Sequence, residues 1–392
     1  MTIPKAPQVF PRSEYLRRMA AVKAEMAKQG VETLVVINIK NITYLTGYTA
    51  KSAYVPQGVV VSASREEPAF ILRQCDWPAA LHQAWMSRDN IIMYPESLVG
   101  VTGKDGFDAV IDYLNDLGVA NRQAGLELND LNVNQMAKFK ARMPNAKFVD
   151  CAKLVHWVRG VKSDLEIELM REAAAIADAA VQRTAEIMRV GVREADVAAE
   201  IYEILARGVN GKPGTDMTNS VFFCASPRTG TCHLRWSEDV FREGSQLNLE
   251  LGGIRHAYVS AIMRTYILGK APDRLRRIHD AEVDGMEAAL AAVKPGRTCH
   301  DVAKAFYDTL GKHGFKKDTR CGYGIGIEWL EPTASLQLGD TTVLKPNMTF
   351  HLMLGNWVDE DFGYVISDTF RVTEGGSEVL GKTPRTLFEI PV

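Results

Sequence analysis

Hydrophobic residues follow a helical spacing early in the chain and then give way to short apolar runs. The segment SEYLRRMAAVKAEMAKQG, residues 13–30, has the helical pattern, with Ser13 as a candidate N-cap and Gly30 as a closing residue. The other predicted elements of this part are strands at 31–37, 58–63, 68–73 and 124–128 and a helix at 105–119. This alternation predicts an α/β domain over residues 1–158.

A helix-start signal opens the second part of the chain. Ser163 and Glu166 form a Ser-x-x-Glu capping box before an apolar-periodic stretch. Residues 159–162 therefore form the predicted domain boundary, and residues 163–392 form a second domain.

The second domain contains an internal repeat. The segments GVREADVAAEIYEIL and GRTCHDVAKAFYDTL begin at Gly191 and Gly296, and in each an Asp-Val-Ala triplet begins five residues after the glycine. Tyrosine and leucine also coincide in register. Because the two similar segments begin far apart, at Gly191 and Gly296, the repeat predicts two similar α+β halves around a pseudo-twofold axis, with a site between them.

Composition narrows the classes of function. The 392 residues carry a formal net charge of -2, which argues against nucleic-acid and membrane-surface partners, because both usually require a basic face. The six cysteines show no Cys-x-x-Cys spacing and are expected to be reduced. The first residues lack the apolar core of a signal peptide, and no apolar run reaches the length of a membrane span. We therefore expect a cytoplasmic protein.

One acidic residue stands out in the segment NLELGGIRHAYVSAIMRT, residues 248–265. Glu250 lies between apolar neighbours on a predicted buried strand, and a second short strand follows the two glycines. A buried carboxylate is costly unless it is paired or used. Glu250 is therefore a candidate nucleophile or general base, the alternative being a structural residue paired with an arginine.

Three segments and one motif carry a resemblance to a known family. The segments NITYLTGY, VKSDLEIELMREAAAIAD and KPGRTCHDV, together with the motif positions Gly252, Tyr258, Ser260, Arg264 and Thr265, are similar to the creatinase/methionine-aminopeptidase family. The resemblance covers nearly the whole chain. It implies a creatinase-like N-terminal α/β domain and an α+β pita-bread catalytic domain.

The metal-binding members of that family hold two divalent ions with five acidic and histidine side chains. The matching positions in this chain are Glu250, Ala261, Tyr323, Met353 and Ser367, with Asp368 one place from the last. This set cannot satisfy a hard divalent ion, and the bridging carboxylates of a two-metal mechanism are missing. The resemblance thus implies the catalytic frame without a metal, and we expect no cofactor.

The resemblance also suggests roles for other residues. His233, in RTGTCHLRWSED, matches a family histidine that shuttles protons, a role suited to neutral imidazole. Tyr258, Tyr323 and His351 are expected substrate contacts. In creatinase-like homodimers the N-terminal domain of the partner caps the pocket, which suggests three further substrate-binding residues: Ser52, Tyr54 and Gln57.

Metal-free members of the family include creatinases and ectoine hydrolases. Creatinases keep a glutamate at the position of Met353, whereas stretches such as YVPQG, HLRWSED, NLELGG and CGYGIG look closer to ectoine hydrolases. The resemblance therefore implies a hydrolase that opens the cyclic amidine ring of ectoine, or of a close relative, to N-acetyl-2,4-diaminobutyrate. The alternatives are a creatinase-like hydrolase of another small zwitterion, a Xaa-Pro-type metallopeptidase, and a non-catalytic binding module.

Overall fold

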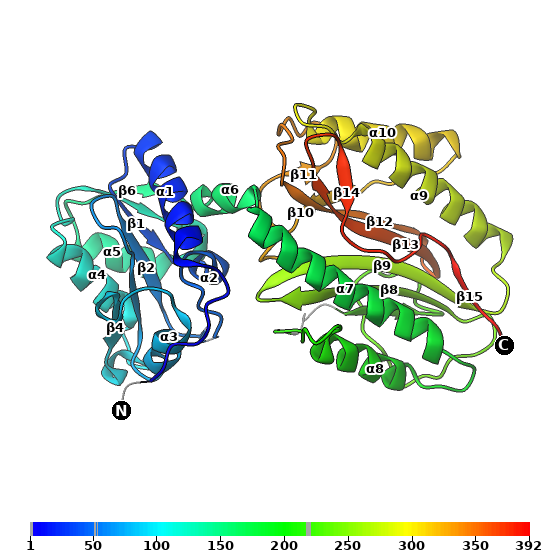
Figure 1. The fold of residues 1–392 in the computed structure, drawn as a ribbon, viewed down its shortest axis with the longest axis horizontal. Coiled ribbons are helices and arrows are strands. Elements are labelled where there is room, and N and C mark those ends of the chain that lie inside the picture. Colours follow the sequence, from blue (N-terminus) through cyan, green and yellow to red (C-terminus); the bar gives the residue numbers. More distant parts are fainter. Residues whose placement is uncertain (1–2, 51, 53, 217–220) are drawn as a thin grey trace. The chain divides into compact units, whose positions relative to one another are not determined.

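The computed structural model describes residues 3–50, 52, 54–216 and 221–392. The chain divides into two compact units, Met1–Arg159 and Gly160–Val392, each built on its own β-sheet (Figure 1). The fold expected from the resemblance, an α/β N-terminal domain followed by a pita-bread domain, is confirmed.

The N-terminal unit is a six-stranded sheet with strand order β4-β3-β2-β1-β5-β6. Its strands are β1 (Thr33–Val36), β2 (Gly58–Ser62), β3 (Ala69–Arg73), β4 (Ile91–Tyr94), β5 (Gln123–Leu126) and β6 (Lys147–Asp150). Its helices are α1 (Arg12–Lys28), α2 (Ile39–Thr46), α3 (Trp77–Gln83), α4 (Gly106–Asp116), α5 (Val133–Arg142) and α6 (Leu154–Gly160), with short 3-10 turns at Arg88–Asn90, Glu96–Leu98 and Leu128–Asp130. The predicted strands at 58–63 and 68–73 correspond to β2 and β3, which form an antiparallel pair.

The start of the first helix differs from the prediction. Helix α1 begins at Arg12 with Pro11 as its N-cap residue, and Ser13 lies inside the first turn. The proline ring fixes φ at about -65°, which suits the residue before a helix, so Pro11 takes the N-cap position although it offers no side-chain cap. Gly30 follows the helix with a φ of 66°, where glycine avoids backbone strain.

The C-terminal unit is a nine-stranded sheet whose main path runs β11-β10-β12-β13-β9-β8-β7. Its strands are β7 (Phe222–Ala225), β8 (Gln246–Arg255), β9 (Tyr258–Leu268), β10 (Gly322–Gly324), β11 (Ser335–Leu336), β12 (Thr349–Asp359), β13 (Phe362–Val372), β14 (Ser377–Val379) and β15 (Phe388–Ile390). Its long helices are α7 (Asp164–Ile187), α8 (Glu194–Arg207), α9 (Asp273–Ala292) and α10 (Cys299–Lys312). The predicted capping box of Ser163 and Glu166 is present at the start of α7.

The predicted repeat is visible as two matching sets of elements. Helices α8 and α10 both span 14 residues, and each is preceded by a glycine with a φ of 84°, Gly191 and Gly296. Each set also contains a long antiparallel hairpin, β8–β9 in one and β12–β13 in the other. The internal pseudo-twofold repeat is therefore confirmed.

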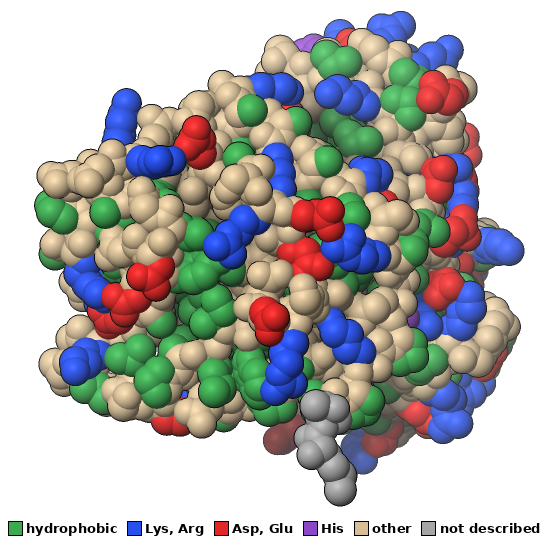
Figure 2. Space-filling view, turned by 60° about the vertical axis from the view of Figure 1, so that its left-hand side comes forward, with side chains coloured by type: hydrophobic (Ala, Val, Ile, Leu, Met, Phe, Trp, Pro, Cys, Tyr) green, Lys and Arg blue, Asp and Glu red, His purple; other side chains and the backbone are tan. Residues whose placement is uncertain are grey.

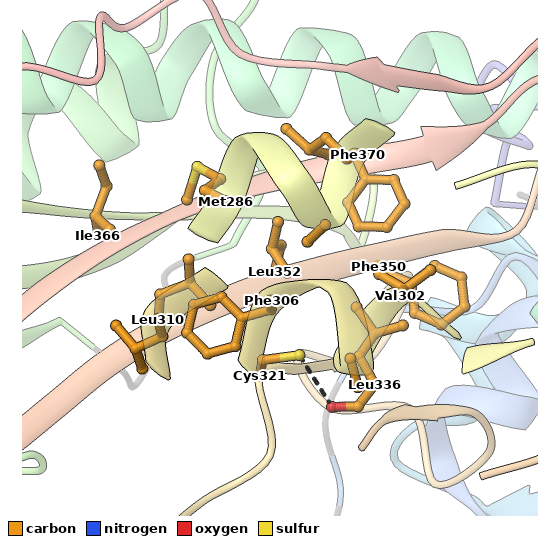
Figure 3. Close-up of a cluster of buried hydrophobic side chains, with 14 of the residues drawn as sticks. Met286, Val302, Phe306, Leu310, Cys321, Leu336, Phe350, Leu352, Ile366 and Phe370 are labelled. Carbon is orange, nitrogen blue, oxygen red and sulfur yellow. Dashed lines mark hydrogen bonds between the residues drawn. The ribbon is translucent and has the colours of Figure 1, made fainter. Parts of the chain in front are cut away.

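Burial of apolar side chains on one face of the large sheet leaves the other face for chemistry. Side chains from α9, α10 and the strands β12 and β13 form one core cluster, which includes Phe306, Leu352 and Phe370 (Figure 3). A second cluster joins α7 and α8 to β8 and β9 through Leu249, Leu251 and other residues. Since successive strand residues face opposite sides, the residues between these core positions lie on the opposite face of the sheet.

The surface carries charges of both signs. On the face drawn in Figure 2, lysine and arginine side chains are interspersed with aspartate and glutamate. Within the described residues, no helix combines the length and the apolar character that crossing a bilayer requires.

Candidate functional site

Glu250 lies in the middle of β8, on the face of the sheet opposite the helices. Its chain neighbours Leu249 and Leu251 belong to the core under α7 and α8, so the alternation of the strand directs Glu250 away from that core. Its direct partners are Phe222 on β7 and Met263 on β9. The residue is 6% exposed, and no hydrogen bond to its carboxylate is formed by any described residue. The arginine pairing expected for a structural residue is therefore not observed in this part of the chain.

Burial sets the electrostatics of this carboxylate. Removal from water raises the pKa of Glu250 to about 8, and no cation among the described residues offsets the effect. The side chain is thus poised between its neutral and charged forms near neutral pH. A cationic group bound beside it would favour the charged form.

A hydrogen-bonded chain occupies the same face of the sheet on strands β10, β12 and β13. His351 lies between the Tyr323 hydroxyl, at 3.1 Å from Nδ1, and the Ser367 hydroxyl, at 2.6 Å from Nε2. Burial lowers the pKa of His351 to about 3, so its imidazole is neutral. Met263 pairs with Ser367 across β9 and β13, which connects this chain to the strand beside Glu250.

Trp329 links the two sides of this face and was missed by the sequence analysis. Its indole N–H donates to the Tyr323 hydroxyl at 3.0 Å, and its ring meets that of His351 edge to face at 5.9 Å. A methyl group added to Gly252 would come within 2.7 Å of Cζ3 of Trp329. Gly252 lies two residues after Glu250 on the same strand face, so the Trp329 ring packs against the face of β8 that carries Glu250.

His233 lies on the loop before β8. Its ring packs on Phe222, the cross-strand partner of Glu250, with ring centroids 4.9 Å apart. Its Nδ1 lies 3.3 Å from the Cys232 thiol. The charge of Glu250 also raises the pKa of Cys232, after the larger effect of burial. The structure therefore brings His233, Tyr323 and His351 to the region around Glu250.

Tyr258 has a different environment. Its hydroxyl donates to Glu166 Oε1 at 2.7 Å, at the start of α7. It pairs with Arg255 at the end of the β8–β9 hairpin, five residues from Glu250 along the chain. Its contact with a substrate stays a prediction.

Ser52, Tyr54 and Gln57 belong to the N-terminal unit. Ser52 is buried, while Tyr54 is 75% exposed and accepts a hydrogen bond from Arg73. Tyr54 and Gln57 line a hollow of about 260 Å³ together with Asp130 and other residues. The Gln57 Nε2 group is buried and lacks a hydrogen-bond acceptor among the described residues. Their role in a partner's site also stays a prediction.

The donor set does not fit a divalent metal ion. Of the five family ligand positions, only Glu250 carries a carboxylate, and no group of three or more histidine, cysteine or acidic residues that could hold a metal occurs among the described residues. Asp368 accepts hydrogen bonds from Arg264 and Arg385, and it alternates with Ser367, whose hydroxyl faces His351. The neighbouring carboxylate is therefore not a substitute ligand.

Comparison with family models agrees with this architecture. Residues 168–374 match the model of metallopeptidase family M24, and residues 18–161 match the creatinase/prolidase N-terminal domain.

Two relatives and one solved structure are informative. An uncharacterized hydrolase/peptidase, y4tL, of Sinorhizobium fredii is 63% identical over 388 residues, covering 99% of each chain. The ectoine hydrolase of Halomonas elongata is 35% identical over 392 residues, covering 97% of this chain and 98% of its own. The crystal structure of dipeptidase PepE from Mycobacterium ulcerans, 25% identical, superimposes with a TM-score of 0.83 and covers 98% of this chain and 100% of its own.

Proposed function

The chain belongs to metallopeptidase family M24, and from that premise we propose that it is a metal-independent hydrolase that opens the cyclic amidine ring of ectoine or a close relative. The product is N-acetyl-2,4-diaminobutyrate. The observation that supports this most is Glu250, a buried carboxylate without a described hydrogen-bond partner at a position where the family places a metal ligand. The 35% identity to an ectoine hydrolase over nearly the full chain supports the choice of substrate.

The chemistry requires one acid and one proton carrier. In a protonated cyclic amidine, the ring carbon between the two nitrogens is electrophilic. Glu250 attacks this carbon or removes a proton from an attacking water, and its charge also pairs with the cationic ring. Water adds to the carbon, one C–N bond breaks, and His233 delivers a proton to the departing nitrogen. The amidine thereby becomes an amide and an amine with the gain of one water.

The raised pKa of Glu250 is compatible with this role. Without a cation bound beside it, the pKa of about 8 keeps a large fraction of Glu250 protonated at neutral pH. A cationic ring bound beside it lowers that pKa, because an opposite charge favours the carboxylate. Binding of the correct substrate therefore activates the catalytic group.

The proposal includes a homodimer acting in the cytoplasm on a small zwitterion. Ser52, Tyr54 and Gln57 would contact the substrate held by the partner subunit, as the creatinase-like N-terminal domain suggests. Mixing Glu250→Gln with Tyr54→Ala subunits should regenerate some active sites by exchange. An active monomer in solution would contradict the shared site.

Ring opening can be tested directly. Purified protein is incubated with ectoine, and the gain of one water is followed by mass spectrometry. Creatine and a Xaa-Pro dipeptide, the latter with added manganese, test the two rival activities in parallel. Cleavage of the dipeptide alone would replace the proposal with the metallopeptidase alternative, and cleavage of creatine alone would replace it with the creatinase-like one.

A further inference from the structure

Arg320 stacks on Tyr323, a residue of the candidate site, and forms no ion pair within the described residues. It precedes β10, and its guanidinium carbon lies 4.7 Å from the centre of the Tyr323 ring. Its Nη1 lies 3.4 Å from the Ser335 hydroxyl, a long contact. Ser335 is the cross-strand partner of Tyr323, so the guanidinium lies on the sheet face that carries Tyr323.

This position connects Arg320 to the region around Glu250. The Tyr323 hydroxyl bonds to Trp329 and His351, and Trp329 also packs beside Gly252 on β8. Burial raises the pKa of Tyr323, the charge of Glu250 raises it further, and the charge of Arg320 lowers it. Tyr323 therefore lies within electrostatic reach of both groups, one acidic and one basic.

Several other arginines of this unit form ion pairs. Arg264 binds Asp368, Arg228 binds Glu194 and Arg371 binds Glu378. Arg320 forms no ion pair within the described residues, although it is half-buried. A guanidinium has five N–H donors arranged to match a carboxylate, and the single long contact to Ser335 leaves most of them unused.

Lys317, a nearby lysine, is less suited than Arg320 to bind a carboxylate. Lys317 donates to the Gly355 carbonyl and lies 5.5 Å from the centre of the Trp357 ring. Burial lowers the pKa of Lys317, and the charge of Glu282 raises it. The charge of Glu282 thus already acts on this ammonium group, whereas Arg320 forms no ion pair within the described residues.

We propose that Arg320 binds the carboxylate of the substrate and thereby selects cyclic amidines that carry one. The inference rests on the proposed function and adds the group that recognises the anionic end of the zwitterion. Glu250 and the aromatic face of Trp329 take the cationic ring, while Arg320 takes the carboxylate. Arg320 is thus a specificity-determining residue, and the chemical step does not require it.

The test compares two substrates in three proteins. The substrates are ectoine and the same cyclic amidine without its carboxylate, and the proteins are the wild type, Arg320→Ala and Arg277→Ala. Arg277 is an exposed arginine of α9 with no contact to the site, which makes it the matched control. Arg320→Ala should lower kcat/KM for ectoine about 10- to 100-fold, mainly through KM, the scale of a lost hydrogen bond to a charged group.

The carboxylate-free amidine makes it possible to measure the preference for ectoine. A purely structural role of Arg320 would lower activity toward both substrates and leave this preference unchanged. The kcat/KM for the carboxylate-free amidine should be low in the wild type and nearly the same in Arg320→Ala, so the preference for ectoine collapses in that variant. Arg277→Ala should keep the preference, and Arg320→Lys should retain part of it, because a single ammonium replaces the fork. An equal loss for both substrates, or an unchanged preference, overturns the inference.

Calorimetric binding of both compounds separates this inference from the proposed function. Preferential binding of ectoine that disappears in Arg320→Ala, without ring opening by the wild type, would sustain the role of Arg320 and refute the reaction. Ring opening by the wild type, with a preference for ectoine that survives in Arg320→Ala, would support the reaction and refute the role of Arg320. If the wild type shows neither a binding preference nor turnover, both are wrong.

Discussion

Two buried glutamates, one in each unit, have similar burial and different surroundings. Glu127 follows β5 and is completely buried, and it accepts hydrogen bonds from Ile37 N at 2.6 Å, Asn38 N at 2.7 Å and Asn41 Nδ2 at 2.5 Å. Glu250 is 6% exposed and accepts none from the described residues. The pKa is raised by burial in both, to about 7 for Glu127 and about 8 for Glu250.

The difference shows how the surroundings of a buried carboxylate indicate its use. The three donors around Glu127 fix the start of α2 to the strand β5, so this side chain stabilises the fold. Glu250 accepts no such bond from the described residues, and none of them compensates its desolvation. Burial with partners indicates structure, whereas burial without partners indicates a group held ready for a ligand.

The same substitution at the two positions should therefore have opposite consequences. Glu250→Gln should reduce turnover of ectoine by about two to four orders of magnitude, the scale of a lost general base. Its thermal midpoint should stay near that of the wild type or rise, because the change removes an unpaired buried acid. Turnover and thermal midpoint are measured on the same samples. Near-normal turnover in Glu250→Gln would end the catalytic assignment.

Glu127→Gln should affect stability and leave turnover unchanged. An amide directs an NH₂ group toward donors that need an acceptor, which should cost about 1–3 kcal/mol of the free energy of unfolding. Denaturant unfolding measures this loss, and turnover per folded molecule should match the wild type. A stable Glu127→Gln protein would show that the three hydrogen bonds do not hold the unit together.

The pH dependence should separate stability from activity. Both glutamates have raised pKa values in the folded state, so the unfolded chain releases these protons at lower pH than the folded chain does. Their stabilising contribution is complete below about pH 4.5 and is lost as the pH rises through about 7 to 8. Activity should instead rise through about pH 8 to a plateau in kcat/KM, because the free enzyme needs ionised Glu250.

The two variants should affect the pH dependence of stability and of activity differently. Glu250→Gln should reduce the decline of stability between about pH 5 and about pH 9 and leave the part due to Glu127, as measured by urea unfolding at several pH values. Glu127→Gln should leave the pH profile of kcat/KM unchanged. An activity that falls steadily above pH 6 in the wild type is incompatible with Glu250 acting as a carboxylate in the free enzyme.

The smallest expected effect is that of metal removal. Since four of the five family ligand positions carry Ala261, Tyr323, Met353 and Ser367, dialysis against a chelator should leave ectoine turnover unchanged. Added manganese or cobalt should not raise it. Loss of activity on dialysis, restored by either ion, would indicate a metal bound by Glu250. Glu250 would then have a partner, as Glu127 does, and the difference between the two glutamates would no longer hold.

Local patterns in the sequence determined much of this molecule. The capping box at Ser163, the β2–β3 pair and the two repeat glycines follow from residues that are close in the chain, where backbone geometry and hydrophobic alternation decide the outcome. Glu250 was identifiable for the same reason, because an acid between core leucines must face the opposite side of its strand.

The composition of the site was decided by the tertiary structure. Strand order places β10 and β12 away from β8 in the sheet, and Trp329 connects the two sides through a contact with Gly252 that no spacing in the sequence encodes. Arg320 combines stacking on Tyr323 with the absence of an ion pair among the described residues, and only the folded structure shows both. Tyr258 matched a motif, yet its hydroxyl is bound by Glu166 at the start of α7. Sequence fixes which groups are available, whereas the long-range pairing of strands decides which of them meet and which are left without partners.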